Sequence, residues 1–194
     1  MATRTRAPVF VPPDPPRTPK SAGTRRRLLD VAGALFVEYG YSAVSIRDIA
    51  AKADLTNGAV YGHFRSKGQL FVEVIRTKLA ESDFPAASDG APKALHGNEL
   101  LYDEARREIR LLEVDAAAAA RNDRDVAAGL AVLYGERHEH IRAAMVHMRD
   151  PDAVAWLIGV ITGGIGAKEA AGLPRPDDER LRALFSDVMR ALGP

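Results

Sequence analysis

The chain has 194 residues, of which 46% are hydrophobic and 27% charged, a composition typical of globular proteins. It contains no cysteine, which excludes disulfides, thiolate nucleophiles, iron–sulfur clusters and cysteine-based zinc sites. No apolar run in the first 30 residues resembles a signal peptide, and the longest apolar stretch, 153–161, is far shorter than the roughly 20 residues that span a bilayer. We therefore expect a cytoplasmic protein with no membrane partner.

Positive charge is concentrated at the front of the chain. Residues 1–82 carry 13 Lys and Arg against 7 Asp and Glu, whereas residues 83–194 carry 14 against 19. A basic segment joined to an acidic one is the asymmetry expected when one end of a protein meets a polyanion. Chance clustering also produces a difference of this size, so a motif is needed before the charge indicates nucleic-acid binding.

The first 20 residues contain six of the twelve prolines of the chain. Because proline interrupts helices and central strands, we expect residues 1–20 to form an extended, disordered arm. Its four basic side chains face a single acidic residue, Asp14. Such an arm can follow a phosphate backbone or enter a minor groove, but a solvated tail without a function is the commoner interpretation of this composition.

Apolar spacing and capping residues predict four helices before residue 80. They cover residues 24–39, 46–53, 57–64 and 67–79. Gly40 ends the first helix as a left-handed cap. Ser45 begins the second helix with Asp48 three residues later, a near capping box, and Thr56 and Ser66 cap the third and fourth.

After a linker at 83–97 that contains proline and glycine, the pattern is helical again to the end of the chain. The expected helices cover residues 98–120, 123–148, 151–171 and 177–192. No segment alternates with the period of a strand for long enough to form a sheet. The predicted fold class is all-α, with eight or nine helices.

Residues 45–67 have the geometry of a helix-turn-helix motif. The two helices cross closely, so the contact position of the first must be small, as Ala50 is. The turn needs a residue that tolerates a left-handed backbone, and Asp54 does so better than most residues. Ten positions after Ala50, the apolar Val60 faces inward from the second helix, which leaves a polar outer face.

The run from Ser45 to Lys67 resembles the DNA-binding signature of the TetR family of bacterial transcriptional regulators. The residues that match the family pattern are Arg47, Asp48, Ile49, Ala50, Ala53, Gly58, Tyr61, His63, Phe64, Ser66, Lys67 and Leu70. The first predicted helix is also similar to the family, so the likeness covers about residues 24–80. Asp54 departs from the pattern, where the family usually has glycine, and so does Gly68, where it usually has an acidic residue. Both departures are expected to loosen how the motif is held.

The resemblance implies an N-terminal helix-turn-helix DNA-binding domain at 21–80 whose third helix enters the major groove. The residues expected at this interface are Ser45, Arg47, Thr56, Asn57, Gly58, Ala59, Tyr61, His63 and Lys67. Asn57 is suited to reading adenine through two hydrogen bonds, while Gly58 and Ala59 let the helix approach closely. Arg47 can reach a base or a phosphate.

The remaining interface residues are expected on the DNA backbone. Ser45 and Thr56 start helices, whose N–H groups attract phosphates, and Lys67 is expected to make a plain phosphate contact. Tyr61 and His63 are expected to contact the DNA backbone, Tyr61 through its hydroxyl and His63 through a ring N–H. For His63 a structural hydrogen bond is an equally good interpretation.

The resemblance also implies an all-helical domain at 81–194 that forms a homodimer through its last two helices and often holds an effector pocket. The residues expected at the dimer interface are Val154, Leu157, Ile158, Ile161, Ile165, Leu181, Leu184, Phe185 and Val188. The candidate pocket residues are Leu101, Ile109, Leu112, Glu113, Leu130, Tyr134, Ile141, Met145 and Trp156. A place in the hydrophobic core explains each apolar pocket residue at least as well.

Metal and catalytic chemistry find little support in the sequence. His138 and His140 are two positions apart and point in different directions on a helix, whereas a zinc pair needs i, i+4 spacing. The glycine-rich segment 162–168 lacks the Gly-Lys-Ser/Thr order of a phosphate loop. We expect no metal, no cofactor and no catalytic residue.

The sequence thus predicts a homodimeric bacterial repressor that binds a palindromic operator in double-stranded DNA and leaves it when a small-molecule effector binds. A DNA-binding regulator or architectural protein without a small ligand is the alternative interpretation, and an α-helical enzyme is a more distant one.

Overall fold

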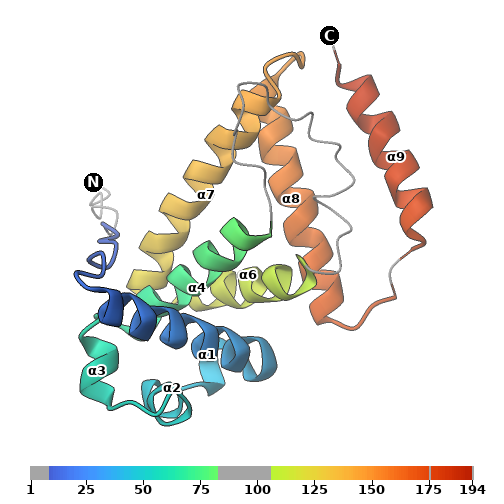
Figure 1. The fold of residues 1–194 in the computed structure, drawn as a ribbon. Coiled ribbons are helices and arrows are strands. Elements are labelled where there is room, and N and C mark those ends of the chain that lie inside the picture. The colour runs from blue at the N-terminus through green and yellow to red at the C-terminus, as the bar shows by residue number, and fades with distance from the viewer. Residues whose placement is uncertain (1–8, 83–105, 175, 194) are drawn as a thin grey trace, which may run out of the picture. The chain divides into compact units, whose positions relative to one another are not determined.

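The computed structural model describes residues 9–82, 106–174 and 176–193, and within these ranges it contains helices and no strands (Figure 1). In chain order the helices are α1 (Pro19–Ala43), α2 (Ile46–Lys52), α3 (Asn57–Tyr61), α4 (Lys67–Glu81), α6 (Arg107–Ala119), α7 (Arg124–Ala144), α8 (Pro151–Ala170) and α9 (Asp178–Ala191). The all-α prediction is confirmed. The predicted linker at 83–97, and Leu101 of the expected pocket, lie outside the described residues.

The chain divides into two compact units. The head unit comprises residues up to 78 together with 115–133, and the body unit comprises 79–114 together with the chain from 134 onward. The sequence places a single boundary at residue 80, so it misses that the end of α6 and the start of α7 belong to the head unit. Three aspartates of that segment accept hydrogen bonds from the rest of the head unit, as described below.

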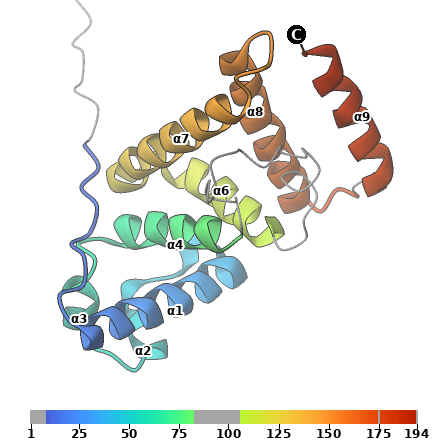
Figure 2. The same ribbon diagram turned by 45° about the horizontal axis from the view of Figure 1, so that its top comes forward.

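The head unit is built on a buried aromatic cluster. The rings of Phe36 and Phe71 meet edge to face with their centres 4.8 Å apart, and Tyr41 stacks on Phe71 at 4.6 Å. Within this unit α1 lies between α4 on one side and α2 and α3 on the other (Figures 1 and 2). Because aromatic pairs add about 0.5–1.5 kcal/mol beyond their burial, the cluster stabilises the packing of α1 against α4.

Helix α1 begins earlier than the apolar pattern predicts. The hydroxyl oxygen of Thr18 accepts a hydrogen bond from the Ser21 amide at 3.1 Å, and Pro19 occupies the first helical position, where its fixed φ is favourable. Gly40 interrupts the helix as expected, with a φ of +79° that side-chain-bearing residues rarely adopt.

The N-terminal arm is docked rather than free over its described part. Phe10 is only 9% exposed and packs with Val72 and Ala128. The Gln69 amide also donates a 2.7 Å hydrogen bond to the Val11 carbonyl. The expected arm thus contacts the rest of the head unit at Phe10 and Val11, because a single large apolar side chain finds a buried site.

The body unit packs α8 between α7 and α9 (Figures 1 and 2). The buried residues of this core are Ile141, Met145, Met148, Val154, Ala155, Ile158 and Phe185. Three of them, Val154, Ile158 and Phe185, are expected from sequence at a dimer interface, but within one protomer they lie in the core and are at most 8% exposed.

Helix α8 is apolar on two sides. Its inward side joins the body core, while Trp156 and Val160 face outward, 65% and 49% exposed. An 18-residue window of α8 reaches a mean hydropathy of 1.2, so among the described helices it is long and apolar enough to cross a membrane by length and composition. Core helices of soluble proteins reach the same length and hydropathy.

Candidate nucleic-acid interface

The turn between α2 and α3 has the geometry that the sequence predicts. The Ser45 amide donates to the Asp48 carboxylate at 2.9 Å and the Asp48 amide donates to the Ser45 hydroxyl at 3.2 Å, which completes a capping box. Asp54 has a φ of +52°, the left-handed conformation that the turn requires. Ala50 and Val60 are buried, 2% and 0% exposed, as the motif requires of these positions.

Helix α3 presents a polar outer face. The Thr56 hydroxyl oxygen accepts from the Ala59 amide at 3.1 Å and caps the helix. Asn57 is exposed and Tyr61 is 54% exposed. A Cβ at Gly58 would meet only the Thr56 hydroxyl, at 3.8 Å, so packing within the protein does not demand glycine there. The face is thus open to an external partner.

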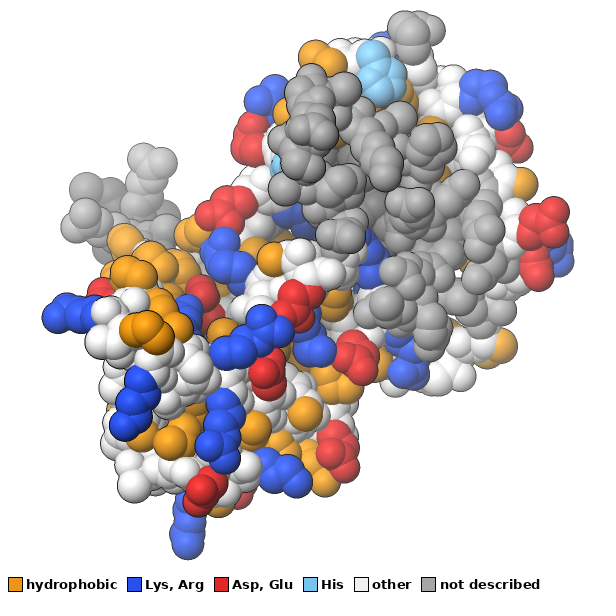
Figure 3. Space-filling view, in the orientation of Figure 1, with side chains coloured by type: hydrophobic (Ala, Val, Ile, Leu, Met, Phe, Trp, Pro, Cys, Tyr) orange, Lys and Arg blue, Asp and Glu red, His pale blue; other side chains and the backbone are white. Residues whose placement is uncertain are grey.

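Basic side chains are exposed on the two helices that precede α3. Arg47 and Lys52 on α2 and Arg27 on α1 are exposed, and Lys and Arg side chains are scattered over the part of the surface that α1–α3 form in Figure 3. A positive surface beside an exposed polar helix is suited to a phosphate backbone.

Lys67 is engaged inside the head unit. Its ammonium donates to the carbonyls of Tyr41 and Val44 at 2.9 and 3.0 Å and lies 4.1 Å from the centre of the Tyr41 ring. Burial lowers the pKa of this ammonium from its ordinary value. Two of its three N–H donors are thus used within the protein, and one is left for the expected phosphate contact. Lys67 also ties the start of α4 to the segment that leads into α2.

His63 is half-buried at the end of the motif. Burial lowers the pKa of its imidazole, and the nearby charge of Arg25 lowers it further. Arg25 itself is paired with Glu73 at 2.9 Å and lies 4.9 Å from the centre of the Phe64 ring. The imidazole is therefore neutral near pH 7 in the protein alone.

Three aspartates hold the end of α1 and the start of α4. Asp115 on α6 accepts from the Tyr41 amide at 2.8 Å, and Asp123 accepts from the Tyr41 hydroxyl at 2.6 Å. Asp125 on α7 accepts from the Ser66 hydroxyl. Sequence reasoning missed these residues because their partners lie some 60–80 positions away in the chain.

Gly68 makes room for one of these aspartates. A Cβ at this position would lie 2.7 Å from Oδ1 of Asp123, closer than such atoms approach. Asp123 therefore places a carboxylate at the start of α4, where a negative charge is favourable. The chain supplies from the α6–α7 turn the acidic group that the sequence pattern leads one to expect at position 68 itself.

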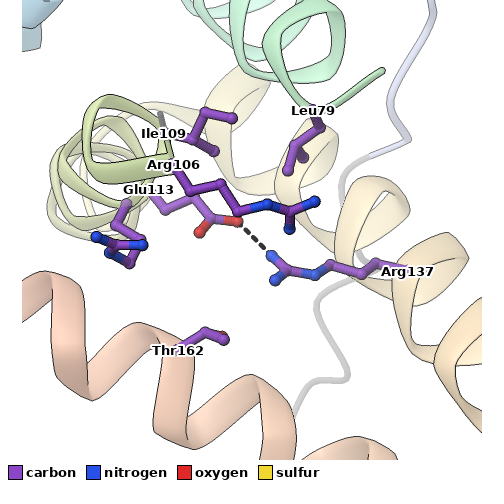
Figure 4. A pocket seen from close by; sticks show the side chains of 7 residues that line it. Leu79, Arg106, Ile109, Glu113, Arg137 and Thr162 are labelled. Atoms are coloured by element: carbon purple, nitrogen blue, oxygen red, sulfur yellow. Dashed lines mark hydrogen bonds and ion pairs between the residues drawn. The ribbon is translucent and has the colours of Figure 1, made fainter. Parts of the chain in front are cut away.

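The body unit contains a small polar cleft, and it differs from the apolar pocket that the sequence predicts (Figure 4). Its lining residues are Leu79, Arg106, Ile109, Arg110, Glu113, Arg137 and Thr162. The cleft measures about 10 Å³, roughly the space that one water molecule needs. Of the expected pocket residues, Ile109 and Glu113 line it.

The other expected pocket residues lie elsewhere. Leu130 belongs to the head unit, Ile141 and Met145 are part of the body core, and Leu112 is buried without lining the cleft. Tyr134 and Trp156 are 38% and 65% exposed. Apolar helical spacing does not tell a core position from a pocket wall, which accounts for this difference.

No group of three potential metal ligands occurs among the residues that the structure describes. His138 lies 2.8 Å from Asp152, and this contact joins α7 to the start of α8.

Known proteins match both parts of the chain. Residues 28–74 match the family model for bacterial regulatory proteins of the tetR family. The HTH-type transcriptional repressor KstR2 of Rhodococcus jostii is 42% identical over 67 residues, which cover 34% of this chain and 33% of KstR2. The HTH-type transcriptional repressor Rv1474c of Mycobacterium tuberculosis is 26% identical over 180 residues, which cover 86% of this chain and 91% of that protein. Residues 28–74 of the chain therefore match the DNA-binding part of the TetR family.

A solved structure supports the same fold. A TetR-family transcriptional regulator from Rhodococcus sp. superimposes with a TM-score of 0.73 at 16% identity, over 89% of this chain and 100% of that one. The match to KstR2 spans about a third of the length of that relative. The TetR-family match at 28–74 contains both unusual residues, Asp54 and Gly68, and the geometry above accommodates each of them.

Proposed function

We propose that this TetR-family protein is a homodimeric transcriptional repressor that reads a palindromic operator with α3 and leaves it when a small-molecule effector binds the body unit. The observation that carries the proposal is the outer face of α3, where Asn57 and Tyr61 are exposed while Val60 is fully buried. A helix anchored on one side and polar on the other can enter a major groove.

A second copy of the chain is the proposed partner of α8. Trp156 and Val160 are exposed one turn apart, and Gly159 and Gly163 face open space beside them. Leu184 on α9 is also 60% exposed. An apolar stripe that includes glycines lets two helices approach closely, and a twofold axis would cover the same stripe on both subunits. The dimer contact is thus proposed for the outward face of α8.

The proposal makes the protein a regulator rather than an enzyme. Its support is the family match, the helix-turn-helix geometry, and the repressor names of its relatives KstR2 and Rv1474c. The body unit is the proposed place of the effector, since the described part of that unit holds the polar cleft of Figure 4.

DNA reading is tested by fluorescence anisotropy with duplexes that carry any inverted repeat found upstream of the gene, with half-sites about 34–36 Å apart. The native protein should prefer this duplex to a scrambled one at the same salt concentration. Asn57→Ala should reduce that preference by about 5- to 100-fold, the value of a two-bond contact to a base. Asn122→Ala, another exposed asparagine, serves as the matched control. Equal binding to both duplexes by the native protein would contradict the proposal.

The dimer face is tested by light scattering of the purified protein. Trp156→Glu places a charge in the stripe and should yield monomers that bind the operator poorly. Val146→Glu alters a valine that is 75% exposed outside the stripe, and it should leave the dimer intact. A dimeric Trp156→Glu variant would show that the contact lies elsewhere.

A further inference from the structure

The body cleft has the chemistry of an anion site. Arg106, Arg110 and Arg137 line it, and Arg106 and Arg110 are only 6% and 3% exposed. Figure 4 shows Arg106 and Arg137 reaching toward Glu113 from different directions, with Thr162 on the far side. Burying a guanidinium group destabilises the fold unless hydrogen-bond acceptors surround it. The acceptors of each arginine therefore show whether its charge is satisfied within the protein.

Two of the arginines have acceptors fixed by the structure. Arg110 makes two contacts of 2.7 Å with the carboxylate of Glu169, the two-point geometry that is strongest for this pair. Arg106 donates to the Ser82 carbonyl at 3.0 Å. The charge of Arg110 is thus balanced by the carboxylate of Glu169.

The hydrogen-bond donors of Arg137 are only partly satisfied. Its Nη1 donates to the Glu113 carboxylate at 2.7 Å, but its Nε is buried without a hydrogen-bond partner. A guanidinium recognises a carboxylate best through two parallel N–H groups, and Glu113 uses a single one. Burial in addition raises the pKa of Glu113, against the lowering effect of the surrounding arginines. The internal pair is therefore a poor substitute for a fully engaged carboxylate.

We propose that the effector is a small organic carboxylate that binds Arg137 through Nε and a neighbouring amino group and takes the place of Glu113. This inference rests on the proposed function. The open space holds about one water, so entry of the anion requires Glu113 to leave Arg137. The short apolar part of the ligand would lie against Leu79 and Ile109.

The carboxylate class is tested by calorimetry and thermal shift on the full-length protein. Butyrate and succinate are the probes, compared with butyramide, inorganic phosphate and sodium chloride at equal ionic strength. The carboxylates should bind and the neutral amide should not. Carboxylates no better than chloride would overturn the proposal and indicate water alone in the cleft, and tighter binding of phosphate would overturn the ligand class.

Two variants should shift the affinity in opposite directions. Arg137→Gln should weaken carboxylate binding by at least about tenfold, since it removes charge-assisted hydrogen bonds. Glu113→Gln removes the internal competitor, so it should strengthen binding, and added butyrate should raise its melting temperature more than that of the native protein. Arg142→Gln is the matched control on the same helix, because Arg142 is exposed and pairs with Glu139. A purely structural Glu113–Arg137 pair would give no gain in Glu113→Gln, which would overturn the proposal.

Operator binding is measured in parallel, so that the two proposals can fail separately. If the protein prefers its operator and carboxylates neither bind nor release it, the carboxylate inference fails while the repressor proposal stands. If carboxylates bind but the protein ignores every inverted repeat, the repressor proposal fails. Binding of carboxylate without any change in operator affinity would overturn the effector assignment.

Discussion

Gly68 offers a sharp test of how the head unit is held together. In Gly68→Ala the new Cβ would lie 2.7 Å from Oδ1 and 3.1 Å from Cγ of Asp123. This carboxylate cannot swing aside without loss, because Oδ1 accepts from the amides of Asp125 and Val126 and Oδ2 accepts from the Tyr41 hydroxyl. The substitution therefore forces either a clash or the loss of these hydrogen bonds.

The expected cost follows from these alternatives. Overpacking in a close contact costs about 1–3 kcal/mol, and loss of the cap and of a hydrogen bond to a charged group costs a similar amount. The better helix propensity of alanine raises the free energy of unfolding by less than about 1 kcal/mol, which offsets part of this loss. We expect a net loss of about 1–2 kcal/mol in the free energy of unfolding, or roughly 2–8 °C in the melting temperature.

Gly23→Ala is the matched control for this prediction. Gly23 lies in α1, and a Cβ there would meet no atom within 4 Å, so alanine should leave stability unchanged or raise it. Urea and thermal unfolding of both variants, followed by circular dichroism, provide the measurement. Gly68→Asp, which restores an acidic residue at that position, should be worse than Gly68→Ala because it adds like charge beside Asp123. If Gly68→Ala is as stable as Gly23→Ala, the close approach of α4 to Asp123 is not as described.

Three further predictions concern other contacts of the head unit. Phe10→Ala should lower the free energy of unfolding by up to about 3 kcal/mol, seen as a lower urea midpoint, whereas Val9→Ala, at a residue 72% exposed, should not; equal midpoints would mean that the arm is not docked. Lys67→Met should destabilise the head unit but leave the slope of log affinity against log salt unchanged, whereas a phosphate contact would lower that slope by about 1. His63 has a lowered pKa in the protein alone; if it meets a phosphate, its pKa rises in the complex, so binding takes up a proton and DNA affinity should increase as the pH falls between the two values. In His63→Gln this pH dependence should disappear, and its persistence there would assign the proton to another group.

The chemistry of short segments could be predicted from the sequence alone. A cap, a turn and a helix start depend on residues three or four positions apart, so the roles of Ser45, Asp54, Thr56 and Ser66 follow from identity and spacing. The outer face of α3 belongs to the same class, because burial of Val60 leaves Asn57 and Tyr61 outside on a helix.

Contacts between distant parts of the chain could not be predicted in this way. Apolar periodicity shows that a helix has a buried side, but α8 has two apolar sides, and only packing shows that Val154 and Ile158 are turned inward while Trp156 is turned outward. For the same reason Leu130, Ile141 and Met145, which are expected at an apolar pocket, lie in the cores of the two units.

Sequence by itself determined the all-α class, the helix-turn-helix motif and its caps, since these arise from interactions within a few turns of the chain. Tertiary structure alone decided that Lys67 is an internal tie, that Phe10 anchors the arm, that Asp123 fills the space left by Gly68, and that Arg137 meets Glu113. Each of these depends on two side chains that are brought together by the packing of helices, and no local pattern encodes which distant partner a charged or apolar residue will meet.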